Sequence, residues 1–574
     1  MKILRKLFLT TFCLFLFLPP VVTSSPIISN LARFSPVEAS NGMVVTTEPL
    51  ATQIGVDVLK RGGNAVDAAV TIGFVLAVTY PRAGNLGGGG FMLFYAAKTS
   101  QIVALDYREV APMRAYPDMF LDCEDHVDTN LSRFSHQAAG VPGTVAGLAL
   151  ALQKYGTLSL AEALAPAIRF AEEGFRVTSA LSRDLKANEH FSQWPASQAI
   201  FLKPDGSFYE VGDIWIQKDL ANTLKLIAQQ GIEAFYQGDI AKLIVKDMKA
   251  HNGLISRADL AAYQPTIRQP VHGSYRGDYE VYSMSPPSSG GVHILQMLNM
   301  LEADNLSELG HNSAATIHLM TEAMKRAYAD RSKYLGDPDF GPLPINGLIS
   351  KAYAAQLRTK FDLTKATASQ TIAPAIPPGY ESPETTHYSV IDKEGNAVSN
   401  TYTLNFSFGS GIVVPGTGFL LNNQMDDFSA KPGEPNAYGL IGSQANAIKP
   451  QKRMLSSMSP TIVLKQGKPF LITGSPGGSR IITTTLQVIL NVIEHKMNIQ
   501  EAVNAIRIHH QWLPDELRIE KGLNLDTINL LKNKGHTLAI KPAMGAASSI
   551  LINQETGIYY GASDPRRTGL ALGY

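Results

Sequence analysis

One threonine, Thr385, stands where nucleophilic chemistry is possible. It follows residues 364–384, a stretch low in aromatic side chains and rich in proline that predicts a mobile linker. A threonine hydroxyl is a weak nucleophile unless a base takes its proton, and the α-amino group of the same residue can be that base. That amine is free only if the chain is cut before Thr385. From position alone, however, a threonine that simply opens a strand is the simpler interpretation.

The motifs of other common chemistries are missing from the sequence. It contains no H-E-x-x-H helix, no paired C-x-x-C and no P-loop. The run of glycines at 87–90 is not a dinucleotide fingerprint, and Gly474-Ser-Pro-Gly-Gly478 is not the G-x-S-x-G elbow of α/β-hydrolases. We therefore expect neither a cofactor nor a metal.

Composition indicates a large globular protein. The chain has 574 residues, of which 45% are hydrophobic and 17% charged, and its formal net charge is +1. It has no long block of one charge sign, so a nucleic acid is not an expected partner.

The N-terminus resembles an export signal. Basic residues at positions 2, 5 and 6 precede a largely apolar run at 7–18, and small residues follow two prolines. The apolar run is shorter than the roughly 20 residues that span a bilayer. We expect cleavage near Ser24 or Ser25 and a periplasmic or secreted protein without a stable membrane anchor; an uncleaved anchor is the alternative.

Residue patterns predict helices mainly before the linker and strands directly after it. A helix should run from Pro49 to the glycines at 62–63, where Asn64 caps the next one, 65–78. Further expected elements are strands at 91–95 and 102–107, helices at 158–173, 220–230, 314–334 and 480–494, and two hairpins, 385–404 and 461–473. Sheets from both halves could pack face to face with helices outside, a layered α/β fold.

Eight short motifs, in order, resemble the γ-glutamyltranspeptidase family. The resemblance covers about residues 41–574. The motifs are Leu86-Gly-Gly-Gly-Gly-Phe91, Asp106-Tyr-Arg-Glu109, Ala139-Gly-Val-Pro-Gly143, Thr385-Thr-His-Tyr-Ser-Val390, Thr401-Tyr-Thr-Leu-Asn405, Leu421-Asn-Asn-Gln-Met-Asp-Asp-Phe-Ser429, Ser456-Ser-Met-Ser-Pro460 and Gly474-Ser-Pro-Gly-Gly478.

The resemblance implies an N-terminal-nucleophile hydrolase fold of mixed α/β class, a four-layer αββα sandwich. It also implies a precursor that, after loss of the signal peptide at 1–24, is cut into a large subunit, about 25–384, and a small subunit, 385–574. The two chains would remain together as a heterodimer and form one catalytic unit.

The resemblance also implies the site residues. The catalytic set is Thr385, Thr403, Gly477 and Gly478, and the substrate-binding set is Arg108, Asn405, Gln424, Asp427, Ser456 and Ser457. Tyr438 matches a lid tyrosine, and an ordinary exposed loop tyrosine is the alternative. Chemistry supports these assignments. Arg108 suits an α-carboxylate, Asp427 an α-ammonium group, and N–H groups just before a helix suit an oxyanion.

The implied activity is transfer of the γ-glutamyl group of glutathione and related compounds to water, amino acids or dipeptides. Two alternatives remain. A related glutaryl or cephalosporin acylase would share the fold and nucleophile, but the acidic Asp427 favours a substrate with an ammonium group. A non-catalytic periplasmic protein that binds γ-glutamyl compounds is the other alternative; Thr385, Thr403 and the full-length linker argue against it.

Overall fold

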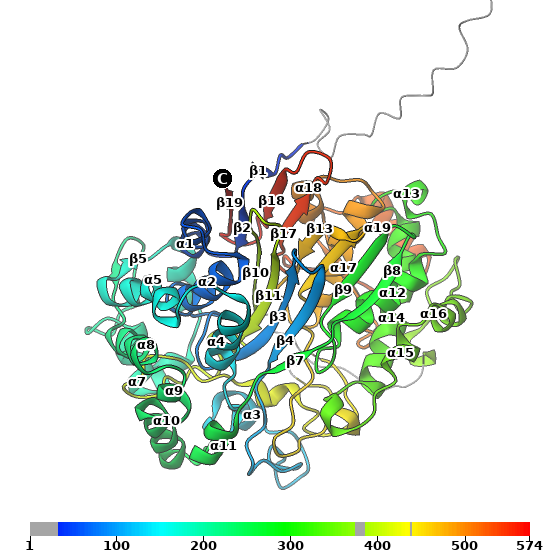
Figure 1. The fold of residues 1–574 in the computed structure, drawn as a ribbon. Coiled ribbons are helices and arrows are strands. Elements are labelled where there is room, and N and C mark those ends of the chain that lie inside the picture. The colour runs from blue at the N-terminus through cyan, green and yellow to red at the C-terminus, as the bar shows by residue number, and fades with distance from the viewer. Residues whose placement is uncertain (1–32, 373–384, 437–438) are drawn as a thin grey trace, which may run out of the picture.

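Two seven-stranded sheets form the centre of the computed structural model, which describes residues 33–372, 385–436 and 439–574 (Figure 1). All neighbouring strands within each are antiparallel. The first sheet has the order β19 (Leu570–Gly573), β2 (Met43–Thr46), β10 (Thr386–Ile391), β11 (Ala397–Thr403), β3 (Gly89–Ala96), β4 (Gln101–Tyr107) and β7 (Thr266–Arg268). The second has the order β1 (Val37–Ala39), β18 (Tyr559–Ser563), β17 (Ser548–Ile552), β13 (Lys468–Thr473), β12 (Thr461–Lys465), β9 (Tyr279–Ser283) and β8 (Val271–Tyr275).

The two sheets pack face to face through an apolar layer. Phe91 and Leu93 of β3 join this layer, where they meet residues such as Ile462 of β12. Met92 and Phe94 of the same strand belong instead to the core beneath the helices. Because successive side chains of a strand point to opposite faces, a strand buried on both faces reads as a continuous apolar run.

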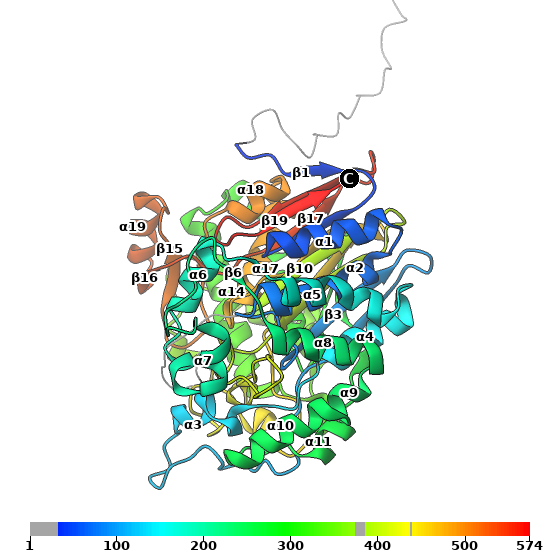
Figure 2. The ribbon, with the colours of Figure 1, turned by 90° about the vertical axis from the view of Figure 1, so that its left-hand side faces the viewer.

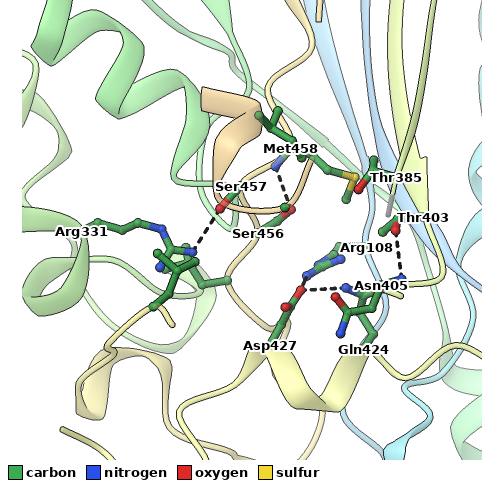
Figure 3. A pocket seen from close by; sticks show the side chains of 14 residues that line it. Arg108, Arg331, Thr385, Thr403, Asn405, Gln424, Asp427, Ser456, Ser457 and Met458 are labelled. Carbon is green, nitrogen blue, oxygen red and sulfur yellow. Dashed lines mark hydrogen bonds and ion pairs between the residues drawn. The ribbon is translucent and has the colours of Figure 1, made fainter. Parts of the chain in front are cut away.

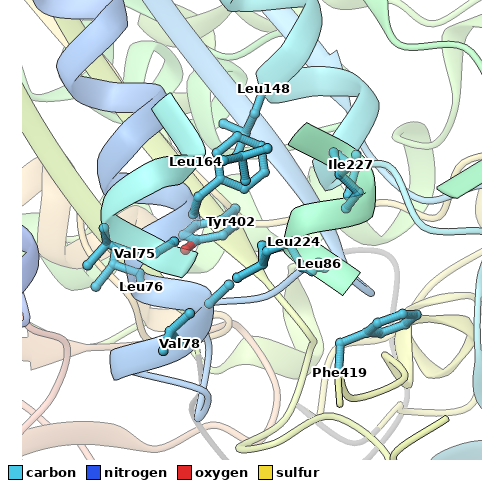
Figure 4. Close-up of a cluster of buried hydrophobic side chains, with 14 of the residues drawn as sticks. Val75, Leu76, Val78, Leu86, Leu148, Leu164, Leu224, Ile227, Tyr402 and Phe419 are labelled. Carbon is cyan, nitrogen blue, oxygen red and sulfur yellow. The ribbon is translucent and has the colours of Figure 1, made fainter. Parts of the chain in front are cut away.

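The outer face of the first sheet is covered by helices (Figure 2). They are α1 (Pro49–Lys60), α2 (Ala65–Thr79), α4 (Thr144–Tyr155), α5 (Leu160–Glu173) and α8 (Lys218–Gln230). Figure 4 shows Val75 of α2, Leu164 of α5 and Leu224 of α8 around Tyr402 of β11. Asn64 caps α2, as the sequence predicted, and forms a capping box with Asp67.

A second helical layer covers the outer face of the other sheet, so the αββα sandwich is confirmed (Figure 1). Its main helices are α12 (Gly290–Leu301), α14 (Ala314–Tyr334) and α17 (Arg480–Ile493). The bounds of α14 are those that the sequence predicted, and α17 ends one residue earlier.

Smaller elements surround the sandwich. The helices are α3 (Thr129–Phe134), α6 (Ser179–Lys186), α7 (Pro195–Phe201), α9 (Glu233–Tyr236), α10 (Asp239–Ala250), α11 (Arg257–Ala262), α13 (Leu306–Leu309), α15 (Ile345–Leu348), α16 (Lys351–Arg358), α18 (Ile499–Asn504) and α19 (Leu525–Asn533). The strands are β5 (Phe175–Arg176), β6 (Ile214–Trp215), β14 (Ile508–His509), β15 (Leu517–Glu520) and β16 (Leu538–Lys541).

The structure adds to one sequence expectation and corrects another. Residues 145–335 are mainly helical, as the sequence predicted, but it did not predict β7, β8 and β9, which lie there and extend both sheets. These strands are only three to five residues long, too short for a clear period. The mobile linker was expected from residue 364, but its first part is anchored. The N–H of Thr367 donates to Glu322 Oε1 at 3.0 Å, and the indole N–H of Trp512 donates to the carbonyl oxygen of Ser369 at 2.9 Å.

Several expectations fall outside the described residues. They are the leader at 1–24, the peptide bond before Thr385 and the lid residue Tyr438. In the part of the chain that the structure describes, every helix is too short or too polar to cross a bilayer.

Candidate active site

Thr385 lies at the entrance to an interior strand of the first sheet. It directly precedes β10, and the β10–β11 register that pairs Thr386 with Tyr402 sets Thr385 opposite Thr403. Both threonines are almost fully buried. The hydroxyl of Tyr402 donates to the carbonyl oxygen of Gly73 in α2 at 2.9 Å, which fixes β11 against the helical layer. The expected nucleophile and its expected partner are therefore neighbours on a rigid strand pair.

A narrow pocket with about 310 Å³ of space between its atoms opens beside Thr385 (Figure 3). It brings together nine of the eleven residues that the sequence singled out; the other two are Gly477, which lies just outside the lining, and Tyr438. The lining consists of Arg108, Arg331, Thr385, Thr403, Asn405, Gln424, Asp427, Leu440, Leu455, Ser456, Ser457, Met458, Gly478 and Ile481.

A buried ion pair crosses the floor of this pocket. Arg108 Nη2 lies 2.5 Å from Asp427 Oδ2, and Arg108 Nε donates to the carbonyl oxygen of Met454 at 3.2 Å. The side chain of Arg108 is fully buried, whereas that of Asp427 is 11% exposed. Gln424 Nε2 donates to the same Asp427 oxygen at 2.7 Å. The sequence assigned Arg108 to a substrate carboxylate and Asp427 to a substrate ammonium group. In this structure the two side chains neutralise each other instead.

Two serines form the opposite wall on a tightly tied loop. The N–H of Ser456 donates to the carbonyl oxygen of Pro287 at 2.8 Å, and Ser456 Oγ accepts from the N–H of Met458 at 3.1 Å. Ser457 Oγ accepts a hydrogen bond from Arg331 Nη2 at 3.4 Å. Since each hydroxyl accepts a hydrogen bond from its own neighbour, its proton can be directed to an anion in the pocket.

The loop after β11 places Asn405 in the pocket. Its N–H donates to Thr403 Oγ1 at 2.9 Å, and its side-chain amide donates to the carbonyl oxygen of Asn423 at 3.0 Å. Its φ of 81° lies in the left-handed region, which asparagine tolerates better than most residues. This turn carries the chain from the strand to the pocket wall.

The glycine pair adopts a backbone conformation that other residues rarely reach. Gly477 has φ 138° and Gly478 has φ 57°, and α17 begins two residues later at Arg480. Among the described residues, none accepts a hydrogen bond from either N–H. Gly478 lines the pocket, whereas Gly477 lines a neighbouring cavity. Two unpaired N–H groups before a helix suit a developing oxyanion.

Sequence reasoning missed Arg331, which lies on the pocket wall opposite Thr385 (Figure 3). Burial lowers the pKa of its guanidinium to about 10, against the opposing charges of Tyr328 and Asp427. Arg331 Nε donates to Ser289 Oγ at 2.9 Å. In the sequence it appeared as an ordinary cation in the last turn of a long helix, where such residues are common.

Glu109 was also missed. It is fully buried, and Arg108 Nη1 lies 3.5 Å from its Oε2. Burial raises the pKa of Glu109 to about 7, although the charge of Arg108 opposes that rise. Its Oε1 has no hydrogen-bond partner among the described residues. The signal in the sequence that could have identified Glu109 is its position directly after Arg108.

One group of side chains in the described regions is close enough to suggest a metal, although the sequence predicted none. His136, Asp247 and His251 bring potential ligand atoms within 4.8 Å of one another. The two imidazoles, however, stack with centroids 4.4 Å apart and planes at 14°. A metal in the plane of one ring would lie off the plane of the other, so the arrangement as it stands does not fit an ion.

Comparisons with known proteins agree with this geometry. The family model described as Gamma-glutamyltranspeptidase matches residues 51–574. The "Glutathione hydrolase proenzyme" of Escherichia coli (strain K12) is 54% identical over 544 residues, which cover 94% of this chain and 93% of that protein.

Solved structures extend the comparison. The cephalosporin acylase from Bacillus halodurans superimposes with a TM-score of 0.83 at 29% identity, covering 96% of this chain and 99% of that one. Helicobacter pylori gamma-glutamyltranspeptidase gives a TM-score of 0.57 at 46% identity, covering 60% of this chain and 97% of that one.

Proposed function

Because this chain belongs to the γ-glutamyltranspeptidase family, we propose that it is a self-processing enzyme that uses Thr385 to transfer the γ-glutamyl group of glutathione and similar amides. The observation that carries this proposal is one pocket that contains Thr385, Gly478 and the Arg108–Asp427 pair. Nucleophile, oxyanion donor and two opposite charges are what a γ-glutamyl amide requires.

Cleavage of the precursor creates the catalytic base, which is the free α-amino group of Thr385. The Thr385 hydroxyl attacks the carbonyl carbon of Glu384, the C–N bond breaks, and the Thr385 nitrogen takes the proton. Water then hydrolyses the resulting ester, which frees residues 25–384 as the large subunit and leaves 385–574 as the small one. The word "proenzyme" in the E. coli relative's name supports a precursor that is processed.

In turnover, the free α-amine of Thr385 accepts the hydroxyl proton while the oxygen attacks the γ-amide carbon. The N–H groups of Gly477 and Gly478 stabilise the oxyanion, and losing one such donor typically costs about 3 kcal/mol of barrier. Thr403, opposite Thr385 in the sheet, positions the nucleophile. The amine leaves, and water, an amino acid or a dipeptide takes the γ-glutamyl group from the ester.

Substrate binding replaces one ion pair with two. The substrate α-carboxylate takes the place of Asp427 on Arg108 and accepts from the hydroxyls of Ser456 and Ser457. The α-ammonium group pairs with Asp427, assisted by the side-chain oxygens of Asn405 and Gln424. Gln424 Oε1 is buried and lacks a hydrogen-bond partner within the described residues, which suits an incoming ammonium donor.

A glutaryl or cephalosporin acylase is the second candidate, because the B. halodurans acylase is so similar in structure. A glutaryl chain has the carboxylate but lacks the ammonium group. It would leave Asp427 buried beside the pocket without its cation, an arrangement that costs free energy. The charge of Asp427 therefore favours γ-glutamyl substrates.

The remaining features belong to the same proposal. The leader at 1–24 directs the protein to the periplasm or the exterior, the two subunits remain as a heterodimer, and Tyr438 has the role of shielding the acyl-enzyme from water.

The test compares γ-glutamyl-4-nitroanilide with glutaryl-4-nitroanilide on purified protein, together with N-terminal sequencing of the smaller fragment. We expect a fragment that begins at Thr385 and faster release from the γ-glutamyl substrate. Faster glutaryl release would favour the acylase. A single uncut polypeptide with full activity would refute the threonine mechanism.

A further inference from the structure

A buried histidine lies between the two sheets, next to the nucleophile. Thr385 and His387 are on the same side of the chain, because successive side chains of a strand point to opposite faces. That side faces the second sheet, since Ile391 packs in the layer between the sheets, whereas Tyr388 and Val390 pack under the helices. The imidazole of His387, which is fully buried, is therefore the next side chain after Thr385 on this inner face.

Each nitrogen of the His387 ring has a hydroxyl partner. Nδ1 lies 2.8 Å from Thr401 Oγ1, and Nε2 lies 3.2 Å from Ser389 Oγ. The Ser389 hydroxyl donates its proton to the carbonyl oxygen of Ser548 in β17 at 2.9 Å. Nε2–H of the ring must therefore donate to Ser389, and Nδ1 accepts from Thr401. Burial lowers the pKa of His387 to about 3, and the neutral ring has the single N–H that this arrangement requires.

Gly474 begins the turn that carries the glycine pair, and it lies against this ring. A Cβ at position 474 would lie 2.4 Å from Cε1 and 2.6 Å from Nδ1 of His387, well inside the roughly 3.5 Å at which non-bonded heavy atoms touch. The φ of Gly474 is outside the left-handed region, so its backbone conformation does not require a glycine. The space that the ring occupies requires it instead.

The other side of the turn is tied to the second sheet. The N–H of Ser548 donates to the carbonyl oxygen of Gly474 at 3.2 Å, and the N–H of Ala546 donates to Ser475 Oγ at 3.0 Å. The hydroxyl of Ser548 donates to the carbonyl oxygen of His387 at 3.3 Å. The base of the turn is thus held between β10 and the start of β17, three residues before the glycine pair.

We propose that His387 is a positioning residue for the oxyanion hole: its ring sets the distance between the strand that follows Thr385 and the turn that carries Gly477 and Gly478. The inference rests on the proposed function, in which these two N–H groups stabilise the oxyanion. It adds the side chain that fixes their place relative to the nucleophile. His387 does not line the pocket, so it acts through the turn. A hydrogen bond weakens steeply outside its normal distance and angle, so a small displacement of the turn is costly.

The test is a double-mutant cycle measured on γ-glutamyl-4-nitroanilide, with Gly474→Ala, His387→Ala and the two changes together. In Gly474→Ala the new methyl group meets the ring and the turn moves, so kcat should fall about 100-fold, the usual effect of losing one oxyanion donor. KM should change by less than about threefold, because Arg108 and Asp427 lie on other segments. The double variant should regain at least about tenfold in kcat over Gly474→Ala, because without the ring the methyl group has room.

Two inhibitors separate a displaced turn from a general loss of structure. In the proposed function glutamate binds in the pocket without a tetrahedral centre. Its analogue with a boronic acid in place of the γ-carboxyl group gains a negatively charged tetrahedral centre on reaction with a hydroxyl, and so resembles the transition state. In His387→Ala, which creates no clash, affinity for the boronate should fall about tenfold while affinity for glutamate changes by less than about threefold.

Gly561→Ala is the matched control. Gly561 lies in β18 of the second sheet, and a Cβ there would lie 2.5 Å from Met43 Sδ of the first sheet. The variant therefore makes a similar clash between the sheets, at a residue that does not line the pocket. Its Tm should fall as it does in Gly474→Ala, whereas its kcat and its affinity for the boronate should equal those of the unaltered protein.

Three results would overturn the positioning role. They are a Gly474→Ala protein that matches the control in kcat, a double variant no more active than Gly474→Ala, and an unchanged affinity of His387→Ala for the boronate. The last result decides the matter even where Gly474→Ala does not fold. An unaltered protein that does not cleave γ-glutamyl-4-nitroanilide would instead contradict the proposed function, and the positioning role would fail with it.

Discussion

Arg108 and Asp427 are separated by 319 positions in the chain, yet they form an ion pair 2.5 Å long at the base of the pocket beside Thr385. The pair is strongly shielded from water. A buried pair is costly to break when one partner is removed, because the other charge is then left without compensation. A substrate that carries both a carboxylate and an ammonium group can separate the pair and satisfy each member.

The preference for γ-glutamyl over glutaryl substrates tests this exchange. In Asp427→Asn the ammonium group loses its charged partner, so the ratio of kcat/KM for γ-glutamyl-4-nitroanilide to that for glutaryl-4-nitroanilide should fall by about 100-fold, or roughly 2.7 kcal/mol. The control is Asp426→Asn. Asp426 pairs with Arg133 and does not line the pocket, so its loss should lower stability and leave the ratio unaltered. A constant ratio in the Asp427 variant would refute the assignment.

Thr385→Ala should abolish both chain cleavage and turnover, because one hydroxyl serves both steps. A denaturing gel and a nitroanilide assay on the same preparation measure the two effects. Thr371→Ala is the control: Thr371 is an exposed residue before the cut, and within the described residues its hydroxyl donates to the carbonyl oxygen of Ala368. Two bands from the Thr385→Ala protein would contradict self-cleavage.

Arg331→Gln tests a residue that the sequence did not single out. Loss of its bonds to Ser289 and Ser457 should loosen the wall that receives the α-carboxylate. We expect KM for γ-glutamyl-4-nitroanilide to rise about tenfold with a smaller change in kcat. Arg331→Lys should recover part of the loss, and Lys333→Gln, an exposed cation on the same helix, should have no effect on KM. A fall in kcat alone would argue against substrate positioning.

Glu109 predicts a pH dependence of stability. Its pKa rises from an ordinary value near 4.5 to about 7 on folding, so the folded protein binds this proton more tightly than the unfolded chain. The associated stabilisation is complete below pH 4.5 and is lost as pH rises through 7, at most about 3 kcal/mol. The Tm of the unaltered protein relative to Glu109→Gln should therefore be higher at pH 5 than at pH 8. An equal difference at the two pH values would show that Glu109 does not titrate in this range.

Several features followed from the sequence because their causes are local. Apolar periodicity defined α14 to the residue, and the turn residues between 391 and 397 defined the β10–β11 hairpin. The short motifs identified nine lining residues of the pocket, because each motif holds its functional side chains within a few positions.

Tertiary structure decided what depends on distant segments. β7, β8 and β9 extend the sheets although each is too short to have a distinctive pattern, since their stability comes from neighbouring strands. The early linker is anchored by Glu322 and Trp512, which lie far away in the sequence. In the sequence, Arg331 has the features of an ordinary cation at the end of a helix. Only the folded structure buries it beside Ser457. Local propensity fixes where an element begins and ends, but only packing determines which side chains share one dry pocket.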